Sequence, residues 1–185
     1  MPSPTRITTL ALVVYGPLTV GALAWAWFVS GRLPWSRQTS WLSIPYGQRL
    51  ALSAGLGLVL ALAVVGMTPG LVRRAQWARS LHLELKTVIA PLSSLEITML
   101  ALVSGIAEEM FFRGAMQPAL GLVLTSLIFG AVHIGAKPVF LAWTGWAFVM
   151  GLLLGLIVEL TGVIWGAVLA HVWINQCNMT FIRRH

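Results

Sequence analysis

Long apolar runs separated by short polar stretches set the pattern of this chain. Residues 7–29 and 50–67 form the first two such runs, and neither contains a charged side chain. A helix of roughly 20 mostly apolar residues is long enough to cross the hydrocarbon core of a bilayer. We therefore predict two membrane-spanning helices here, with the second ending where a proline and a glycine follow each other at residues 69 and 70.

The second half of the chain repeats this pattern four times. A long helix is predicted over residues 91–117, broken at Pro118, and three further apolar runs cover residues 119–135, 139–158 and 162–181. The total is about six spans, so the expected fold is all-α: a polytopic integral membrane protein built as a bundle of transmembrane helices. Because the run at 119–135 has only 17 residues, five spans with one re-entrant segment is the alternative.

A different pattern joins these two halves. Residues 71–86 contain four basic side chains together with Leu and Trp, which is typical of an amphipathic segment lying on the membrane surface. We expect a two-span region with this basic linker over residues 1–90 and a four-helix core over residues 91–185, within a single membrane domain. The first apolar run is longer than the core of a signal peptide, so we expect it to be retained as an anchor.

Composition excludes a water-soluble globule. Of the 185 residues, 58% are hydrophobic and only 9% are charged, and all five acidic residues are Glu. The net charge of +7 comes from short basic clusters beside the apolar runs, which fits membrane-flanking charge rather than a nucleic-acid surface. The single Cys177 excludes a disulfide within the chain.

The basic residues also predict an orientation. If the N-terminus is cytoplasmic, eight basic residues of the loops and ends lie inside and three lie outside. The inner group is Arg6, Arg73, Arg74, Arg79, Lys86, Lys137, Arg183 and Arg184, and the outer group is Arg32, Arg37 and Arg49. Lys and Arg are enriched in cytoplasmic loops, so we expect both termini inside a bacterial or archaeal cytoplasmic membrane.

The helix predicted over residues 91–117 carries unusual charge. Glu108, Glu109 and Arg113 lie among Ala, Met and Phe, although each ionisable group at membrane depth costs about 2.5–3.5 kcal/mol on insertion scales. Glu109 and Arg113 are four positions apart and share a helical face, so they are expected to form an ion pair, with Glu108 facing elsewhere. A polar cluster that only holds the bundle together is the structural alternative.

Two later spans carry histidines at a similar spacing. Phe129 and His133 are four positions apart, as are His171 and Asn175, so each pair lies on one helical face. Alone, each pair could simply join two helices. Together, one carboxylate pair, two imidazoles and one amide in an otherwise apolar bundle are the groups needed to activate water.

These three motifs carry a family resemblance. The EExxxR sequence at 108–113, FxxxH at 129–133 and HxxxN at 171–175 resemble the motifs of the CPBP family. Its members are the CAAX proteases and bacteriocin-processing enzymes, also called the Abi family, and they resemble the eukaryotic CAAX prenyl protease Rce. The resemblance implies an intramembrane endopeptidase acting on a membrane-associated or lipid-tethered protein or peptide.

The resemblance also implies a role for each residue. Glu108 and His133 would activate the hydrolytic water, and His171 and Asn175 would stabilise the oxyanion. Glu109, Arg113 and Phe129 would hold these four side chains in place.

A metal is the alternative to this arrangement, because the family has also been described as metalloproteases. Zinc would be held by Glu108, His133 and His171, with an open position for water. We expect no cofactor, since the sequence shows no HExxH spacing and no acid beside each histidine.

Two functions from other classes remain open at this point. The same Glu and His residues could form the relay of a proton-coupled carrier, although no internal repeat is visible. A non-catalytic Abi-like scaffold or immunity protein is the other alternative.

The expected partners are the lipid bilayer and the substrate, with no nucleic acid. His82 and His185 lie outside the motifs and are expected to be solvated.

Overall fold

A computed structural model describes residues 4–36 and 38–185, and all regular structure in these ranges is helical. The helices are α1 (Pro4–Ser30), α2 (Tyr46–Arg74), α3 (Gln76–Ile89), α4 (Ser94–Glu109), the π-helix η1 (Met110–Met116), α5 (Gln117–Leu120), α6 (Leu122–Ala131), α7 (Phe140–Thr161) and α8 (Trp165–Arg184). The predicted all-α fold is confirmed. Arg37 and the side chain of Arg6 lie outside the described part.

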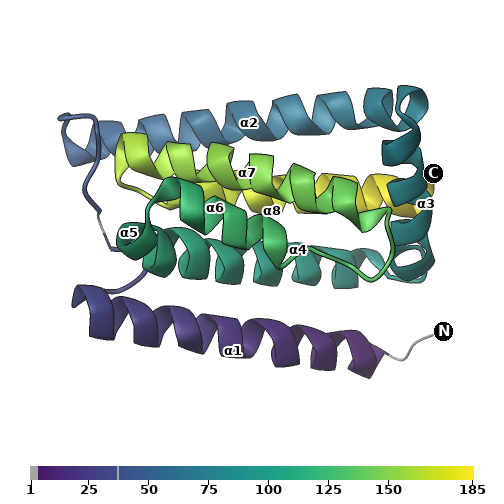
Figure 1. The fold of residues 1–185 in the computed structure, drawn as a ribbon, viewed down its shortest axis with the longest axis horizontal. Coiled ribbons are helices and arrows are strands. Elements are labelled where there is room, and N and C mark those ends of the chain that lie inside the picture. Colours follow the sequence, from purple (N-terminus) through teal and green to yellow (C-terminus); the bar gives the residue numbers. More distant parts are fainter. Residues whose placement is uncertain (1–3, 37) are drawn as a thin grey trace.

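The long helices run side by side along the longest dimension of the molecule (Figure 1). Helices α1 and α2 lie on opposite sides, with α4, α7 and α8 between them, while the short α3 crosses one end of the bundle. Both chain termini lie at that same end. An arrangement with both termini on one side of a membrane fits this geometry, and which side that is stays a prediction.

Two predicted helix ends are wrong. Helix α2 continues through Pro69 to Arg74, and the helix containing the acidic pair continues through Pro118 to Leu120. Proline removes only one backbone N–H, and its fixed φ is compatible with a helix. The second helix ends instead at Gly121, whose φ of 78° requires a residue without a side chain.

The span predicted over residues 119–135 is also wrong. Helix α6 has 10 residues, which at 1.5 Å per residue is about 15 Å, roughly half of a bilayer core. This favours the alternative with a re-entrant segment. In the described ranges three helices are long and apolar enough to span a membrane, or up to four if the bent pair of α3 and the helix after it counts as one span. The total of about six stays a prediction.

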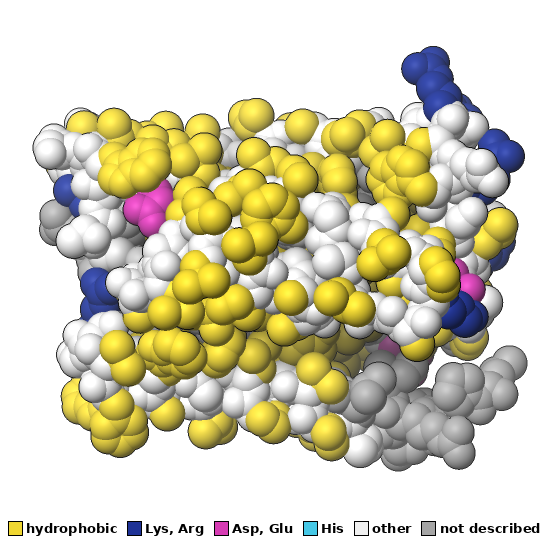
Figure 2. Space-filling model, in the orientation of Figure 1, with side chains coloured by type: hydrophobic (Ala, Val, Ile, Leu, Met, Phe, Trp, Pro, Cys, Tyr) yellow, Lys and Arg dark blue, Asp and Glu magenta, His cyan; other side chains and the backbone are white. Residues whose placement is uncertain are grey.

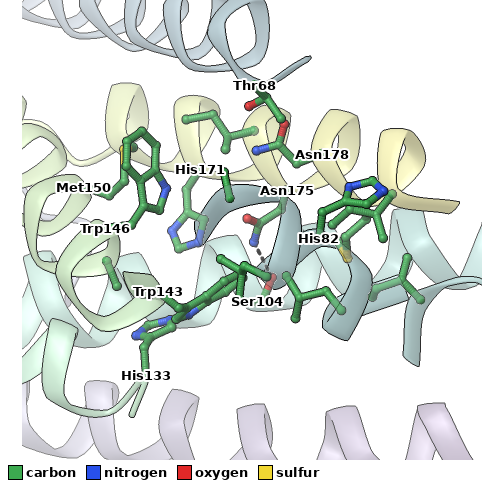
Figure 3. Close-up of a pocket in the computed structure, with 18 of the residues that line it drawn as sticks. Thr68, His82, Ser104, His133, Trp143, Trp146, Met150, His171, Asn175 and Asn178 are labelled. Carbon is green, nitrogen blue, oxygen red and sulfur yellow. Dashed lines mark hydrogen bonds between the residues drawn. The ribbon is translucent and has the colours of Figure 1, made fainter. Parts of the chain in front are cut away.

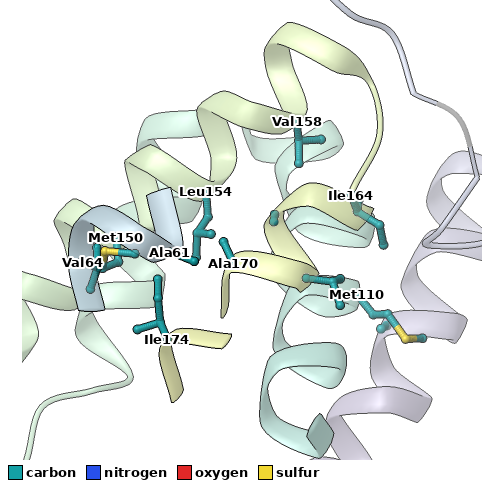
Figure 4. Close-up of a cluster of buried hydrophobic side chains, with 12 residues drawn as sticks. Ala61, Val64, Met110, Met150, Leu154, Val158, Ile164, Ala170 and Ile174 are labelled. Carbon is teal, nitrogen blue, oxygen red and sulfur yellow. The ribbon is translucent and has the colours of Figure 1, made fainter. Parts of the chain in front are cut away.

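The core of the bundle lies where α2, α7 and α8 meet (Figure 4). Ala61 and Val64 of α2 pack there against Leu154 of α7 and Ala170 of α8. Close packing of α2 on α8 depends on glycine, because a Cβ built on Gly57 would lie 2.1 Å from the Gly166 carbonyl oxygen. Small residues let two helix backbones approach within a membrane, where apolar burial alone does not drive association.

The surface divides into an apolar middle and two charged ends. Figure 2 shows hydrophobic side chains over the length of the bundle and dark blue basic side chains at its ends. Large apolar side chains such as Leu12, Val59, Val123 and Leu141 are more than half exposed. An apolar belt of this kind faces lipid rather than water.

Candidate active site

The acidic pair lies where α4 changes into a π-helix. From Met110 to Met116 the backbone adopts the wider π register, and the N–H of Gln117 bonds to the carbonyl of Phe112. Short π segments inside α-helices are rare and are often found at functional sites. The sequence analysis predicted a regular helix here.

Glu109, Arg113 and His171 form a buried network. The guanidinium of Arg113 donates to Glu109 Oε1 at 2.9 Å, as the spacing predicted, and His171 Nδ1 donates to the same oxygen at 2.7 Å. The exposed fractions are 0% for Glu109, 1% for Arg113 and 9% for His171. A buried carboxylate is tolerated when it is paired and hydrogen-bonded, and here both conditions hold.

Glu108 lies on the other side of His171. Its Oε2 is 3.9 Å from His171 Nε2 and is buried without a hydrogen-bond partner among the described residues. The phenol of Tyr15, on α1, lies near Glu108 and Ser104. The imidazole of His171 therefore lies between the two carboxylates. Each carboxylate has an oxygen without a partner among the described residues, but of the two only Glu108 lines the cavity.

Asn175 lies one turn after His171 on α8. Its Nδ2 donates to Ser104 Oγ at 3.0 Å, the bond drawn as a dashed line in Figure 3. An amide nitrogen carries two hydrogens, so one of them stays available. His171 and Asn175 both line the same cavity, as their shared helical face predicted.

Phe129 connects His133 to this network. Its ring centroid is 4.8 Å from that of His133 and 6.2 Å from that of His171, and the guanidinium of Arg113 lies 4.4 Å from the Phe129 centroid. His133 lies in the turn after α6 rather than in a spanning helix, and its Nδ1 donates to the carbonyl of Phe129 at 2.6 Å. That bond leaves Nε2 as the acceptor nitrogen.

A single cavity of about 380 Å³ joins these side chains. Glu108, His133, His171 and Asn175 all line it, although His133 reaches the acidic pair through Phe129 rather than by direct contact. From there the cavity extends beneath α3. Apolar side chains dominate this extension, which we call the chamber: Leu81, Leu85, Ile89, Leu100, Met179 and Ile182.

One histidine prediction is wrong. His82 is not solvated: it is 7% exposed, lines the chamber, and packs with its ring 5.4 Å from that of Phe181. Burial, together with the nearby cations of Lys86 and His185, holds the pKa of the His82 imidazole below its ordinary value.

The three candidate zinc ligands, Glu108, His133 and His171, all line the cavity. One argument against a metal does not hold, because Glu109 does lie beside His171, and carboxylates commonly orient metal-binding histidines in this way. However, no three His, Cys, Asp or Glu side chains of the described ranges lie close enough to share an ion. The residues as they stand do not fit a three-ligand zinc site, and no reaction step is routed through one.

Sequence reasoning missed Tyr15 and Ser104. Ser104 precedes Glu108 by four positions, so helical spacing alone could have placed its hydroxyl beside the carboxylate. Tyr15 gave no such signal, because its place beside Glu108 depends on how α1 packs on α4.

Comparisons with known proteins agree with the motifs. Residues 90–177 match the family model of type II CAAX prenyl endopeptidases, Rce1-like. The chain is also 36% identical over 102 residues to the uncharacterized protein YpbD of Bacillus subtilis (strain 168), an alignment that covers 52% of each protein. The chain thus spans about half the length of this curated relative, and no solved structure matches it.

The apolar helices and the matched segment together indicate an integral membrane protein with a segment similar to CAAX prenyl endopeptidases. Residues 90–177 are thus similar to the Rce1-like CAAX prenyl endopeptidases, which confirms the predicted resemblance to the CPBP proteases. This family implies intramembrane protease activity in general.

Proposed function

We propose that this chain is an intramembrane endopeptidase that hydrolyses a peptide bond in a membrane-associated or lipid-tethered protein or peptide. The observation that carries the proposal is the environment of Glu108. Its free carboxylate oxygen lies 3.9 Å from an imidazole that is itself fixed by a fully buried carboxylate. A carboxylate with a free oxygen beside a fixed imidazole on a cavity wall provides a general base next to a hydrogen-bond donor.

Water activation is assigned to Glu108 and His133. Glu108 takes a proton from the water, and the Nε2 lone pair of His133 accepts a hydrogen bond that orients it. The resulting hydroxide attacks the carbonyl carbon of the scissile bond. Glu108 then returns the proton to the amine that leaves when the C–N bond breaks.

The oxyanion is assigned to His171 and Asn175. A protonated His171 donates from Nδ1 to Glu109 and has Nε2–H left for the oxyanion, while Asn175 keeps one amide hydrogen beyond its bond to Ser104. Donors fixed before the reaction stabilise the transition state without reorganisation, often by about 3–4 kcal/mol each. Glu109, Arg113 and Phe129 hold these donors in position.

The chamber supports a substrate with an apolar portion. The whole cavity has a volume of about 380 Å³, which is within the range of small-molecule sites, and the wall of the chamber is mainly hydrocarbon. An extended peptide or lipid-bearing segment could lie along it with its scissile bond at Glu108.

The experiment compares membrane proteomes by mass spectrometry. Three strains are needed: one with the native protein, one lacking it, and one expressing Glu108→Gln. We expect a membrane protein whose mass or anchoring changes in the second and third strains alike. A third strain that matches the native one would contradict the proposal.

We also propose that both termini lie on the cytoplasmic side. The end of the bundle that carries the termini also carries Arg73, Arg74, Lys86, Arg183 and Arg184, whereas Arg32 and Arg49 lie near the other end. A fluorescent protein fused to the C-terminus should fold and fluoresce, whereas alkaline phosphatase fused there should be inactive. The reverse pattern would contradict this orientation.

A further inference from the structure

The π-helix leaves one backbone carbonyl without its helical partner. In this register the N–H of Gln117 bonds five residues back, to Phe112, instead of four residues back, to Arg113. The same register would pair the Arg113 carbonyl with residue 118, but Pro118 has no N–H. A buried carbonyl left without a donor is unfavourable, because it has lost its bonds to water and gained none in return.

A side chain from far away in the sequence supplies the missing donor. Gln38 Nε2 donates to the Arg113 carbonyl at 2.9 Å, and Gln38 is only 7% exposed. Gln38 belongs to the connection between α1 and α2, residues 31–45, which we call the strap. The bond joins residues 75 positions apart and ties the strap to the acidic motif.

Backbone hydrogen bonds and close packing hold the strap against α7 and the π-helix. The backbone N–H of Gln38 donates to the Gly162 carbonyl at 2.9 Å, and that of Trp41 donates to the Glu159 carbonyl at 2.8 Å. Pro34 lies so close to the π-helix that a Cβ on Gly114 would be 2.5 Å from the Pro34 carbonyl oxygen. The amide of Gln38 is therefore held in place by contacts on both sides of it.

The position of the Arg113 backbone matters because of what its side chain holds. The guanidinium donates to Glu109 Oε1 at 2.9 Å and to the Gly151 carbonyl at 3.3 Å, and Glu109 in turn fixes His171. We propose that Gln38 is a positioning residue for this network, acting through the Arg113 carbonyl. This inference rests on the proposed function, and it places part of the machinery outside the segment matched by the family model.

A double-mutant cycle tests the inference. Gln38→Met keeps the length and shape of the side chain but removes the donor, and Pro118→Ala restores a backbone N–H that can reach the Arg113 carbonyl. The control is Ser40→Ala, because Ser40 bonds only within the strap, to the Leu42 carbonyl. The probe is a synthetic peptide that copies the processed segment found in the proteome comparison above. Its cleavage by each variant is measured in liposomes, with kcat and KM determined separately.

We expect Gln38→Met to lower kcat by about 10-fold or more with KM nearly unchanged, since a small misplacement of reacting groups costs rate rather than binding. In the Pro118→Ala background the same substitution should cost about threefold or less, and Ser40→Ala should have no effect. Coupling of this kind is expected only for groups that share one partner.

Three results would overturn the inference. One is a normal kcat for Gln38→Met. Another is an equal loss in both backgrounds, which would mean that Gln38 does not act through this carbonyl. The third is failure of Gln38→Met to fold in both backgrounds. Failure of the proposed function gives a different result, because then the wild-type protein and Glu108→Gln would behave alike.

Discussion

The two ends of the active-site cavity differ in the interactions that hold them together: hydrogen bonds and ion pairs at one end, and apolar contacts at the other. At one end, His171 lines the cavity and is backed by Glu109 and Arg113; these three side chains, which we call the polar floor, are at most 9% exposed and are joined by hydrogen bonds through Glu109. At the other end, the chamber beneath α3 is lined mainly by hydrocarbon and offers few polar contacts.

This difference shows which side chains have fixed positions and which part of the cavity can accept ligands of different shape. In the floor a displaced atom leaves a buried charge unpaired, so the arrangement is strongly determined. In the chamber, apolar contact is non-directional and tolerates ligands of different shape. A reaction centre fixed at one end and an adaptable surface at the other would suit an enzyme that acts on one bond within variable substrates.

Breaking the polar floor should have the largest effect. Arg113→Met removes the guanidinium from the buried Glu109 carboxylate and leaves it with only its bond to His171; breaking a buried ion pair typically costs about 3–5 kcal/mol of stability. The double variant Glu109→Gln/Arg113→Met removes both charges and should regain much of that stability, while its protease activity stays lost. Denaturant unfolding in detergent measures the first effect. Equal stability of the two variants would contradict the assigned pairing.

Removing an oxyanion donor should come next. Asn175→Ala is expected to lower kcat by about 100-fold or more while KM changes little, because the lost bond forms only in the transition state. Ser104→Ala, which removes only the side chain that Asn175 contacts, should cost less. A larger loss for Ser104→Ala than for Asn175→Ala would reverse the assignment.

Filling the chamber should affect binding rather than chemistry. Leu81→Trp places a larger side chain in the cavity and should raise KM by about 10-fold with kcat nearly unchanged. The matched control is Leu83→Trp, since Leu83 lies on the outer face of α3 and is 58% exposed. An equal rise in KM for both variants would mean that the chamber does not hold substrate.

The smallest expected effect concerns Tyr15. Tyr15→Phe removes one hydroxyl near Glu108, and a single hydrogen bond typically contributes about 1 kcal/mol, so cleavage should slow by about fivefold. Initial rates at saturating substrate measure this. Complete loss of activity would give Tyr15 a direct role in the reaction.

Contacts between residues four positions apart could be predicted from the sequence. The ion pair of Glu109 with Arg113 and the ring contact of Phe129 with His133 follow from a spacing of four, because that spacing places two side chains on one face. The all-helical fold follows from the apolar runs in the same way.

Contacts between helices could not be predicted. His171 and Glu109 are 62 positions apart, and Gln38 and Arg113 are 75 apart, so both bonds depend on how the helices pack. The π register was missed because it changes which backbone groups pair without changing the hydrophobic pattern. The span over 119–135 was wrong because an apolar run does not reveal that its helix ends at Ala131.

The central claim is that Glu108 activates water for peptide hydrolysis, and Glu108→Gln in the purified protein tests it most directly. The control is Glu96→Gln, because Glu96 only caps the start of α4 by accepting from the Ser93 backbone N–H at 2.7 Å. We expect Glu108→Gln to unfold at the same temperature as the wild type and to cleave no detectable peptide in liposomes, while Glu96→Gln stays active. Cleavage by Glu108→Gln at the wild-type rate would contradict the account.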